Sequence, residues 1–174
     1  MASGKVVGII QAVMAPAANG AAFGVRAGGS TPGENFPIFK FDDTTSEYLD
    51  IYFKLENYDA GGLVVAGMWS AADTTVDPDV VKWEGAFRRL QADAEDIDAS
   101  HTYDYNAATE SQEASASGEG VFFSGMTFTH GADMDSIVNG ECGVFRLRRN
   151  TSTTGNNLGG DAELWISTLT IKES

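Results

Sequence analysis

The side chains most able to do chemistry in this chain are its carboxylates, because it has 25 acidic residues but only two histidines and one cysteine. Acidic residues cluster at Asp42/Asp43, Glu95/Asp96/Asp98 and Asp133/Asp135. Glycosidases use two carboxylates that face each other across a cleft as catalytic groups, and clustered carboxylate oxygens are ligands for calcium. In so acidic a chain, clustering alone does not indicate catalysis, and the segment 93–98 lacks the spacing and glycine of an EF-hand loop. We expect no cofactor, with calcium at this acidic segment as the alternative.

Other patterns that indicate catalysis or metal binding are absent from the sequence. His101 and His130 belong to no cysteine–histidine constellation, and zinc needs more ligands than these. Neither a G-x-S-x-G elbow nor a phosphate-binding glycine loop between a strand and a helix occurs. Cys142 is the only cysteine, so no disulfide forms within the chain, and we expect a buried, inert thiol. The sequence therefore predicts a protein that is not an enzyme.

The net charge of −14 restricts the partners of the chain. Nucleic acids and anionic membranes bind proteins through lysine and arginine, so we expect neither as a partner. No apolar run approaches the roughly 20 residues that span a bilayer. The charge is uneven: no lysine or arginine occurs between Gln91 and Phe145, and three arginines then follow as Arg146, Arg148 and Arg149.

Apolar residues alternate with polar ones along most of the chain, with a period of two that predicts half-buried strands. The expected strands are Phe36–Phe41, Tyr48–Leu55, Leu63–Trp69, Val80–Leu90, Val121–His130, Glu141–Arg149 and Ala162–Lys172. The segment 106–120 is expected as a loop, Asp133–Val138 as a helical turn with Asp133 as N-cap, and 91–105 as either a strand or a helical turn. With eight to ten strands and no helical periodicity, the predicted fold is all-β, an antiparallel two-sheet sandwich of jelly-roll type.

The first 33 residues are rich in alanine and glycine and lack a core pattern of their own. Within them, Val6–Val13 reads as an edge strand or an extended arm, and Ala21–Arg26 as a second strand. The expected organisation is an N-terminal arm or edge strands over residues 1–33 and a β-sandwich domain over residues 34–174.

The aromatic residues admit two interpretations. Trp69, Trp83 and Trp165 lie on predicted strands, so we expect them in the core. Exposed tyrosines would instead provide a sugar-stacking platform or an oligomer interface. The candidates are Tyr48, Tyr52, Tyr58, Tyr103 and Tyr105.

Three segments together resemble small β-sandwich virion proteins of tailed bacteriophages. The first has a turn, Gly61-Gly62-Leu63 and an apolar strand that ends at Trp69. The second is Val80–Arg89, with the pattern V-x-W-x-x-x-x-R, and the third pairs Gly143–Asn150 with Asp161–Ile171. The resemblance covers residues 45–90 and 119–172, and the acidic segment between them matches no motif of these proteins.

The resemblance implies a head decoration, or cement, protein: a homotrimer on the outer capsid surface that is made in the host cytoplasm and stabilises the head by binding the major capsid protein. The alternative that it implies is a receptor- or carbohydrate-binding appendage of the tail or a vertex. The family has no catalytic residues to carry over. For contact with the capsid or a partner, we expect the N-terminal stretch and the returning arginines, namely Lys5, Val6, Val7, Ile9, Ile10, Arg146, Arg148 and Arg149.

Overall fold

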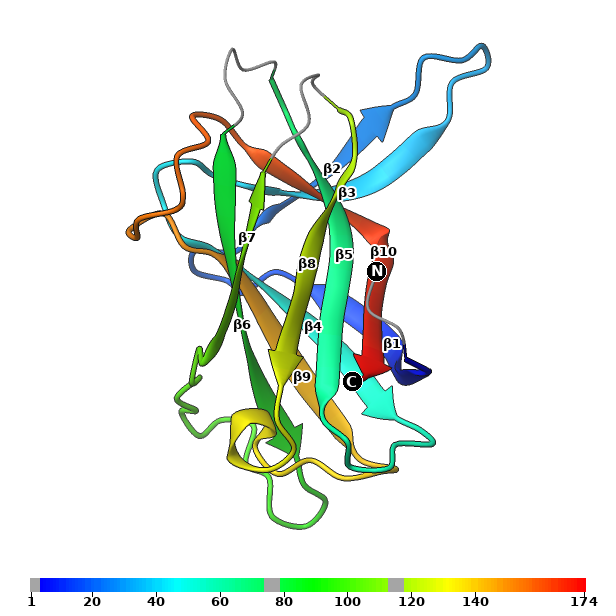
Figure 1. Ribbon diagram of the computed structural model, residues 1–174, viewed down its shortest axis with the longest axis vertical. Coiled ribbons are helices and arrows are strands. Elements are labelled where there is room, and N and C mark those ends of the chain that lie inside the picture. The colour runs from blue at the N-terminus through cyan, green and yellow to red at the C-terminus, as the bar shows by residue number, and fades with distance from the viewer. Residues whose placement is uncertain (1–3, 74–78, 113–117) are drawn as a thin grey trace.

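Ten β-strands and one short 3-10 turn make up the regular structure of the part of the chain described by the computed structural model, residues 4–73, 79–112 and 118–174 (Figure 1). The strands are β1 (Val6–Met14), β2 (Ala22–Ala27), β3 (Asn35–Phe41), β4 (Glu47–Leu55), β5 (Leu63–Ala71), β6 (Val80–Leu90), β7 (Ala107–Gln112), β8 (Val121–Phe128), β9 (Cys142–Arg149) and β10 (Ala162–Glu173). The turn is η1 (Ala132–Met134). Within the described ranges, no helix is long and apolar enough to cross a membrane.

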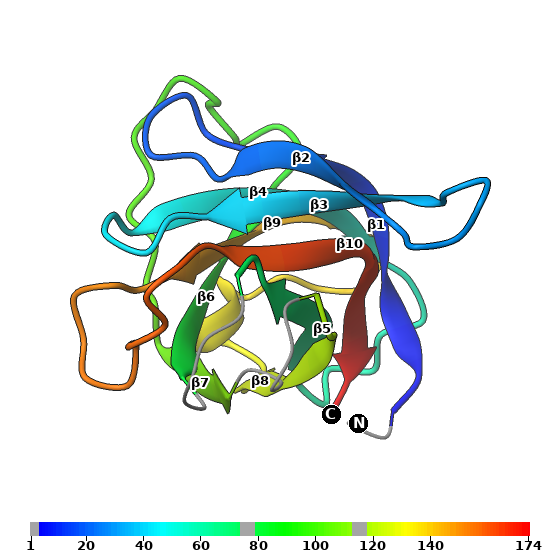
Figure 2. The same ribbon diagram turned by 90° about the horizontal axis from the view of Figure 1, so that it is seen from above.

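The strands form one antiparallel sheet. Its order is β2-β3-β10-β1-β4-β9-β6-β7, and β5 pairs with β10 on one side and with β8 on the other. The long strand β10 makes this branching geometrically feasible, because its first half pairs with β3, its second half pairs with β1, and β5 follows both halves. Figure 2 shows that the sheet curls round its interior until β7 and β8 lie side by side. There the Ser111 hydroxyl donates to the carbonyl of Phe122 over 3.4 Å.

Aromatic rings fill the interior of the curled sheet. Strands β4, β6 and β9 alternate as the sequence predicts, so that each sends every second side chain inward. Phe87 packs on Phe128 and Phe145 with ring centres 4.7 and 5.0 Å apart, and Trp83 packs on Trp69 at 6.1 Å. Each such ring contributes about 1.5–3 kcal/mol through burial, so this cluster is the main source of stability.

The predicted all-β class and the seven strands outside the N-terminal stretch are confirmed. Two local predictions were wrong. The segment 106–120 was expected as a loop, but Ala107–Gln112 forms strand β7, which pairs with β6. Its buried residues, Ala107 and Ser111, are too small to produce a hydrophobic pattern in the sequence. Residues 113–117 of the expected loop lie outside the described ranges. The N-cap of η1 is Gly131, because the Asp133 carboxylate accepts from the backbone of Thr129 and the amide of Asn106 instead.

The N-terminal stretch contributes two strands with different surroundings. Strand β1 lies within the sheet, between β10 and β4, and its Val7 is 1% exposed. Strand β2 lies at the end of the sheet and pairs with β3 alone. Both views place β1, β2 and β3 on one side of the molecule and β6 and β7 on the other (Figures 1 and 2).

Candidate functional site

Arg146 and Arg148 lie on the outward face of β9, where the register places each opposite a carboxylate. Asp50 on β4 faces Arg146, which donates to it twice, from Nε over 2.6 Å and from Nη2 over 2.7 Å. Glu84 on β6 faces Arg148, whose Nε donates to it over 2.6 Å. Hydrogen bonding to Asp50 raises the pKa of Arg146. Both predicted contact residues are therefore committed to ion pairs within their own sheet.

The segment 91–105 covers these two ion pairs. Its Tyr103 ring centre lies 4.1 Å from the guanidinium carbon of Arg146, and its Tyr105 ring centre lies 3.8 Å from that of Arg148. Burial raises the pKa of both tyrosines. At its start the segment is anchored by Glu95, which accepts from Nε of Arg88 over 2.8 Å. The acidic segment that the sequence left unassigned is thus a strap across the outer face of β4, β9 and β6, and two of its tyrosines stack on arginines.

Arg149 is buried, in contrast to its two neighbours on β9. Its exposed fraction is 0%, and its guanidinium donates to the carbonyls of Phe41, Leu158 and Gly160 and to the amide oxygen of Asn156. The loop between β9 and β10 is therefore closed onto β3 by one side chain. Of the three arginines expected at a partner contact, this one has its guanidinium inside the protein.

Three carboxylates near Arg149 could hold a metal ion: Asp42, Asp43 and Asp161 each offer an oxygen within 4.8 Å of the others. The buried charge of Arg149 acts on all three, and it offsets part of the negative charge that would attract a cation. Asp42 also accepts from the backbone and hydroxyl of Thr44. The acidic segment considered as the alternative calcium site lies elsewhere, and its Glu95 is paired with Arg88.

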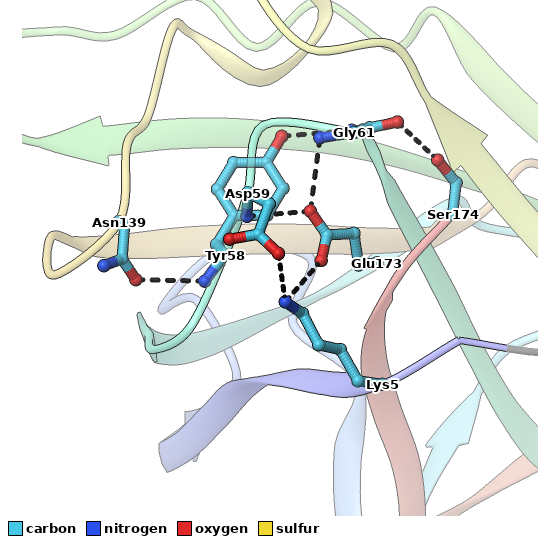
Figure 3. A network of polar contacts seen from close by, with 8 residues as sticks. Lys5, Tyr58, Asp59, Gly61, Asn139, Glu173 and Ser174 are labelled. Atoms are coloured by element: carbon cyan, nitrogen blue, oxygen red, sulfur yellow. Dashed lines mark hydrogen bonds and ion pairs between the residues drawn. The ribbon is translucent and has the colours of Figure 1, made fainter.

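Lys5, another predicted contact residue, ties the two ends of the chain together (Figure 3). Its ammonium lies 2.5 Å from Asp59 and 3.1 Å from Glu173. The other oxygen of Glu173 accepts from the backbone N–H groups of Asp59 and Gly61, and the hydroxyl of Ser174 donates to the carbonyl of Gly61. This network fixes the turn between β4 and β5 against the start of β1 and the end of β10.

Exposed apolar side chains gather on the first three strands, whose exposed surfaces we together call the N-terminal face; Phe23 and Val25 lie on one side of the β2–β3 pair and Phe36 lies on the other. Of the nine large hydrophobic residues that are exposed in the described part of the chain, six lie here: Val6, Ile9, Met14, Phe23, Val25 and Phe36. Residues 1–41 carry three basic and one acidic side chain, whereas the remaining residues carry eight basic and 24 acidic ones. The three basic side chains, Lys5, Arg26 and Lys40, are ion-paired with carboxylates from later in the chain, so this face is rich in exposed apolar side chains and adds few acidic ones of its own. Val6 and Ile9, both predicted as contacts, belong to it, while Val7 is buried and Ile10 is half-buried.

A small pocket of about 230 Å³ opens on the outer side of β2, β3 and β10. Its aromatic wall is formed by Phe36 and the half-buried Trp165, stacked with ring centres 6.1 Å apart. The indole N–H donates to Ser70 over 3.0 Å, and the guanidinium of Arg26 pairs with the buried Glu163. Gly118 and Gly120 allow the chain to lie against these side chains, since a Cβ there would come within 2.6 Å of Arg26 and 2.8 Å of Trp165, respectively.

Sequence reasoning did not single out Arg26 or Phe36, because they come together with Trp165 only through pairing of β2, β3 and β10. It placed all three tryptophans in the core, which holds for Trp69 and Trp83. Cys142 is half-buried and free. Compared with known proteins, the chain matches no family model and no curated protein.

Proposed function

We propose that this chain is a non-enzymatic virion structural protein, a decoration protein that binds the major capsid protein on the outer surface of a tailed-phage head. The observation that carries the proposal is the N-terminal face. Exposed apolar side chains that gather in one region mark protein interfaces, and only one of the 25 acidic residues, Glu34, belongs to the stretch that forms this face. The resemblance of the strand motifs to small phage virion proteins supports the same assignment, which involves no catalytic residue and no cofactor.

We further propose that the fold is a two-sheet jelly roll. The strand order supports it, because β8-β5-β10-β1 and β4-β9-β6-β7 form two runs of four strands that face each other across the aromatic core. Strands β2 and β3 extend the first run beyond this frame. A rigid frame with an apolar extension suits a protein whose task is to clamp neighbours.

A decoration protein stabilises the capsid by mass action, since it binds the assembled lattice and not the free subunits. In this proposal the N-terminal face would meet the capsid. The paired Arg146 and Arg148 then serve the sheet itself, whereas Ile9 on β1 serves the contact.

Binding to purified heads that lack the protein tests this function. Ile9→Glu places a charge on the N-terminal face, on β1 and not on β2, and is expected to weaken binding by about tenfold or more. The matched control is Ile97→Glu, because Ile97 is 82% exposed but lies in the strap, and this variant is expected to bind as the unmodified protein does. Equal binding by both variants would refute the assigned face. Quantitative mass spectrometry of virions supplies the second test, with hundreds of copies expected and absence of the chain refuting the function.

The pocket beside Trp165 favours a second candidate function, a carbohydrate-binding appendage. Aromatic faces attract the polarised C–H groups of a sugar ring, and the volume of the pocket suits one sugar ring. Screening against bacterial surface glycans tests this candidate, with Trp165→Ala expected to abolish any binding. A glycan that binds equally well to Trp165→Ala would exclude this pocket.

A further inference from the structure

We infer that strand β2 pairs edge to edge with a second copy of this chain. The inference deepens the proposed function, on which it rests, by naming one occupant of the N-terminal face. Among the residues that the structure describes, strand β2 ends the sheet and pairs with β3 alone, so one side of its backbone has no neighbouring strand from these residues. Such an edge is a template for another strand.

Edge strands that stay monomeric are protected by charge, proline or a bulge. Strand β2 reads Ala-Phe-Gly-Val-Arg-Ala, and its pairing with β3 runs without a register shift from Ala22 to Ala27. Its one charged side chain, Arg26, is turned toward Glu163 on β10. Neither proline nor bulge interrupts this edge.

The side chains of β2 are those of an interface. None of its six residues is buried, and Phe23 and Val25 are 65% and 54% exposed. The rings of Phe23 and Phe39 pack edge to face, with their centres 5.6 Å apart. Part of the Phe23 ring therefore contacts Phe39, and the rest of it faces solvent. Two copies that meet here would bury both apolar side chains from each strand.

Charge favours a second copy at this edge over any other part of the surface. Outside residues 1–41 the chain has 24 acidic against eight basic side chains, so two copies repel each other where those regions meet. Strand β2 itself carries a single charged side chain, Arg26, and this charge is paired with Glu163, so two copies that meet at β2 bring no unbalanced charge of that strand together. The simplest pairing is antiparallel, β2 to β2 about a two-fold axis, because a single strand then supplies both sides of the interface, and it gives a dimer in place of the homotrimer that the resemblance implies.

Light scattering and sedimentation of the full chain, from about 1 to about 100 µM, test the inference. The expected result is an oligomer that Val25→Lys, which charges the edge, converts to a monomer. Val138→Lys is the control, since Val138 is 43% exposed and lies far along the chain, after η1, and it should leave the oligomer intact. Phe23→Lys repeats the test if Val25→Lys does not fold.

Hydrogen exchange supplies an independent readout, because the outward amides of β2 should become protected as concentration rises. A monomer at about 100 µM, or an oligomer that persists in both edge variants, would overturn the inference. The head-binding assay separates the two proposals. Monomeric protein that still binds heads leaves the function standing without the pairing, and an oligomer that ignores heads leaves the pairing standing without the function.

Discussion

Arg146 on β9 and Tyr103 in the strap lie face to face, with the guanidinium carbon 4.1 Å from the ring centre. The same guanidinium donates to both oxygens of Asp50. The cation therefore joins three parts of the chain: β4 and β9 through ionic hydrogen bonds, and the strap through its ring face. Tyr105 repeats the arrangement on Arg148, so the strap is fixed at two adjacent points.

Removing one of these rings should loosen the strap. Tyr105→Ala is expected to lower the free energy of unfolding by about 1–2 kcal/mol, because a partly desolvated cation–π contact and its buried ring are lost. Urea unfolding measures this change. Thermolysin cleavage before the exposed Ile97 should also accelerate. Tyr105→Phe keeps the ring and should behave as the unmodified protein, so an equal loss in both variants would contradict the stacking.

Arg149 should be essential for folding. Arg149→Met leaves three carbonyls without their guanidinium donor, at about 1–3 kcal/mol each, and should lower the stability by about 3 kcal/mol or more. Arg149→Lys keeps the charge but not the planar set of donors, and should recover only part of the loss. Thermal unfolding with circular dichroism measures both. A fully stable Arg149→Lys variant would show that charge alone suffices.

The sequence allowed the strands with large alternating residues to be predicted, since a core of phenylalanines and tryptophans imposes a period of two. Strand β7 escaped because its inward positions hold Ala107 and Ser111, and pairing with β6 stabilises it without a hydrophobic signal. Strand β1 gave no indication of its two neighbours, because pairing with β10 joins the start of the chain to its end.

Predicting the site from sequence was limited by side-chain partners that are distant along the chain. Arg146, Arg148 and Arg149 look alike in sequence, yet Asp50, Glu84 and a set of loop carbonyls give them different roles. The strap tyrosines were recognised as candidates, but their stacking depends on a fold-back onto β9 that no local pattern encodes. The sequence of β2 predicted a strand but not that its apolar residues are exposed, because exposure depends on which strands lack neighbours in the sheet.

Gly85 should resist substitution because β6 passes directly under a core ring. A Cβ at Gly85 would come within 2.3 Å of the Phe145 ring, so Gly85→Ala is expected to cost about 1–3 kcal/mol through overpacking. Gly29→Ala is the control, since a Cβ there meets nothing within 4 Å, and its effect should stay below about 0.5 kcal/mol. Denaturant unfolding measures both. An unaffected Gly85→Ala variant would contradict the packing of β6 against β9.

Stability should be greatest in mildly acidic solution. Burial raises the pKa of Glu47 and of Asp161, so between the raised values and the ordinary pKa of about 4 the folded protein binds more protons than the unfolded chain, and stability rises as the pH falls through this window. Hydrogen bonding lowers the pKa of Asp42 and of Glu141, whose stabilisation is lost as the pH falls through the lowered values.

The melting temperature is therefore expected to rise as the pH falls from 7 toward about 4, the ordinary pKa of these carboxyls, and to fall at lower pH. Differential scanning calorimetry across this range measures it. Asp161→Asn removes one of the raised groups and should reduce the rise on the neutral side of this maximum while leaving the acid limb unchanged. If the melting temperature of this variant rose by the same amount, the pH dependence would have to come from the net charge alone.

Salt should strengthen the contact between copies. The net charge of −14 repels a second copy at long range, while the contact at β2 is apolar, so screening removes the repulsion and leaves the attraction. Raising sodium chloride from about 0.05 to about 0.5 M is expected to increase the association constant by about tenfold. Sedimentation measures it, with Val25→Lys as the control that should stay monomeric at both concentrations. Weaker association in salt would mean that ion pairs, and not the apolar edge of β2, hold the copies together.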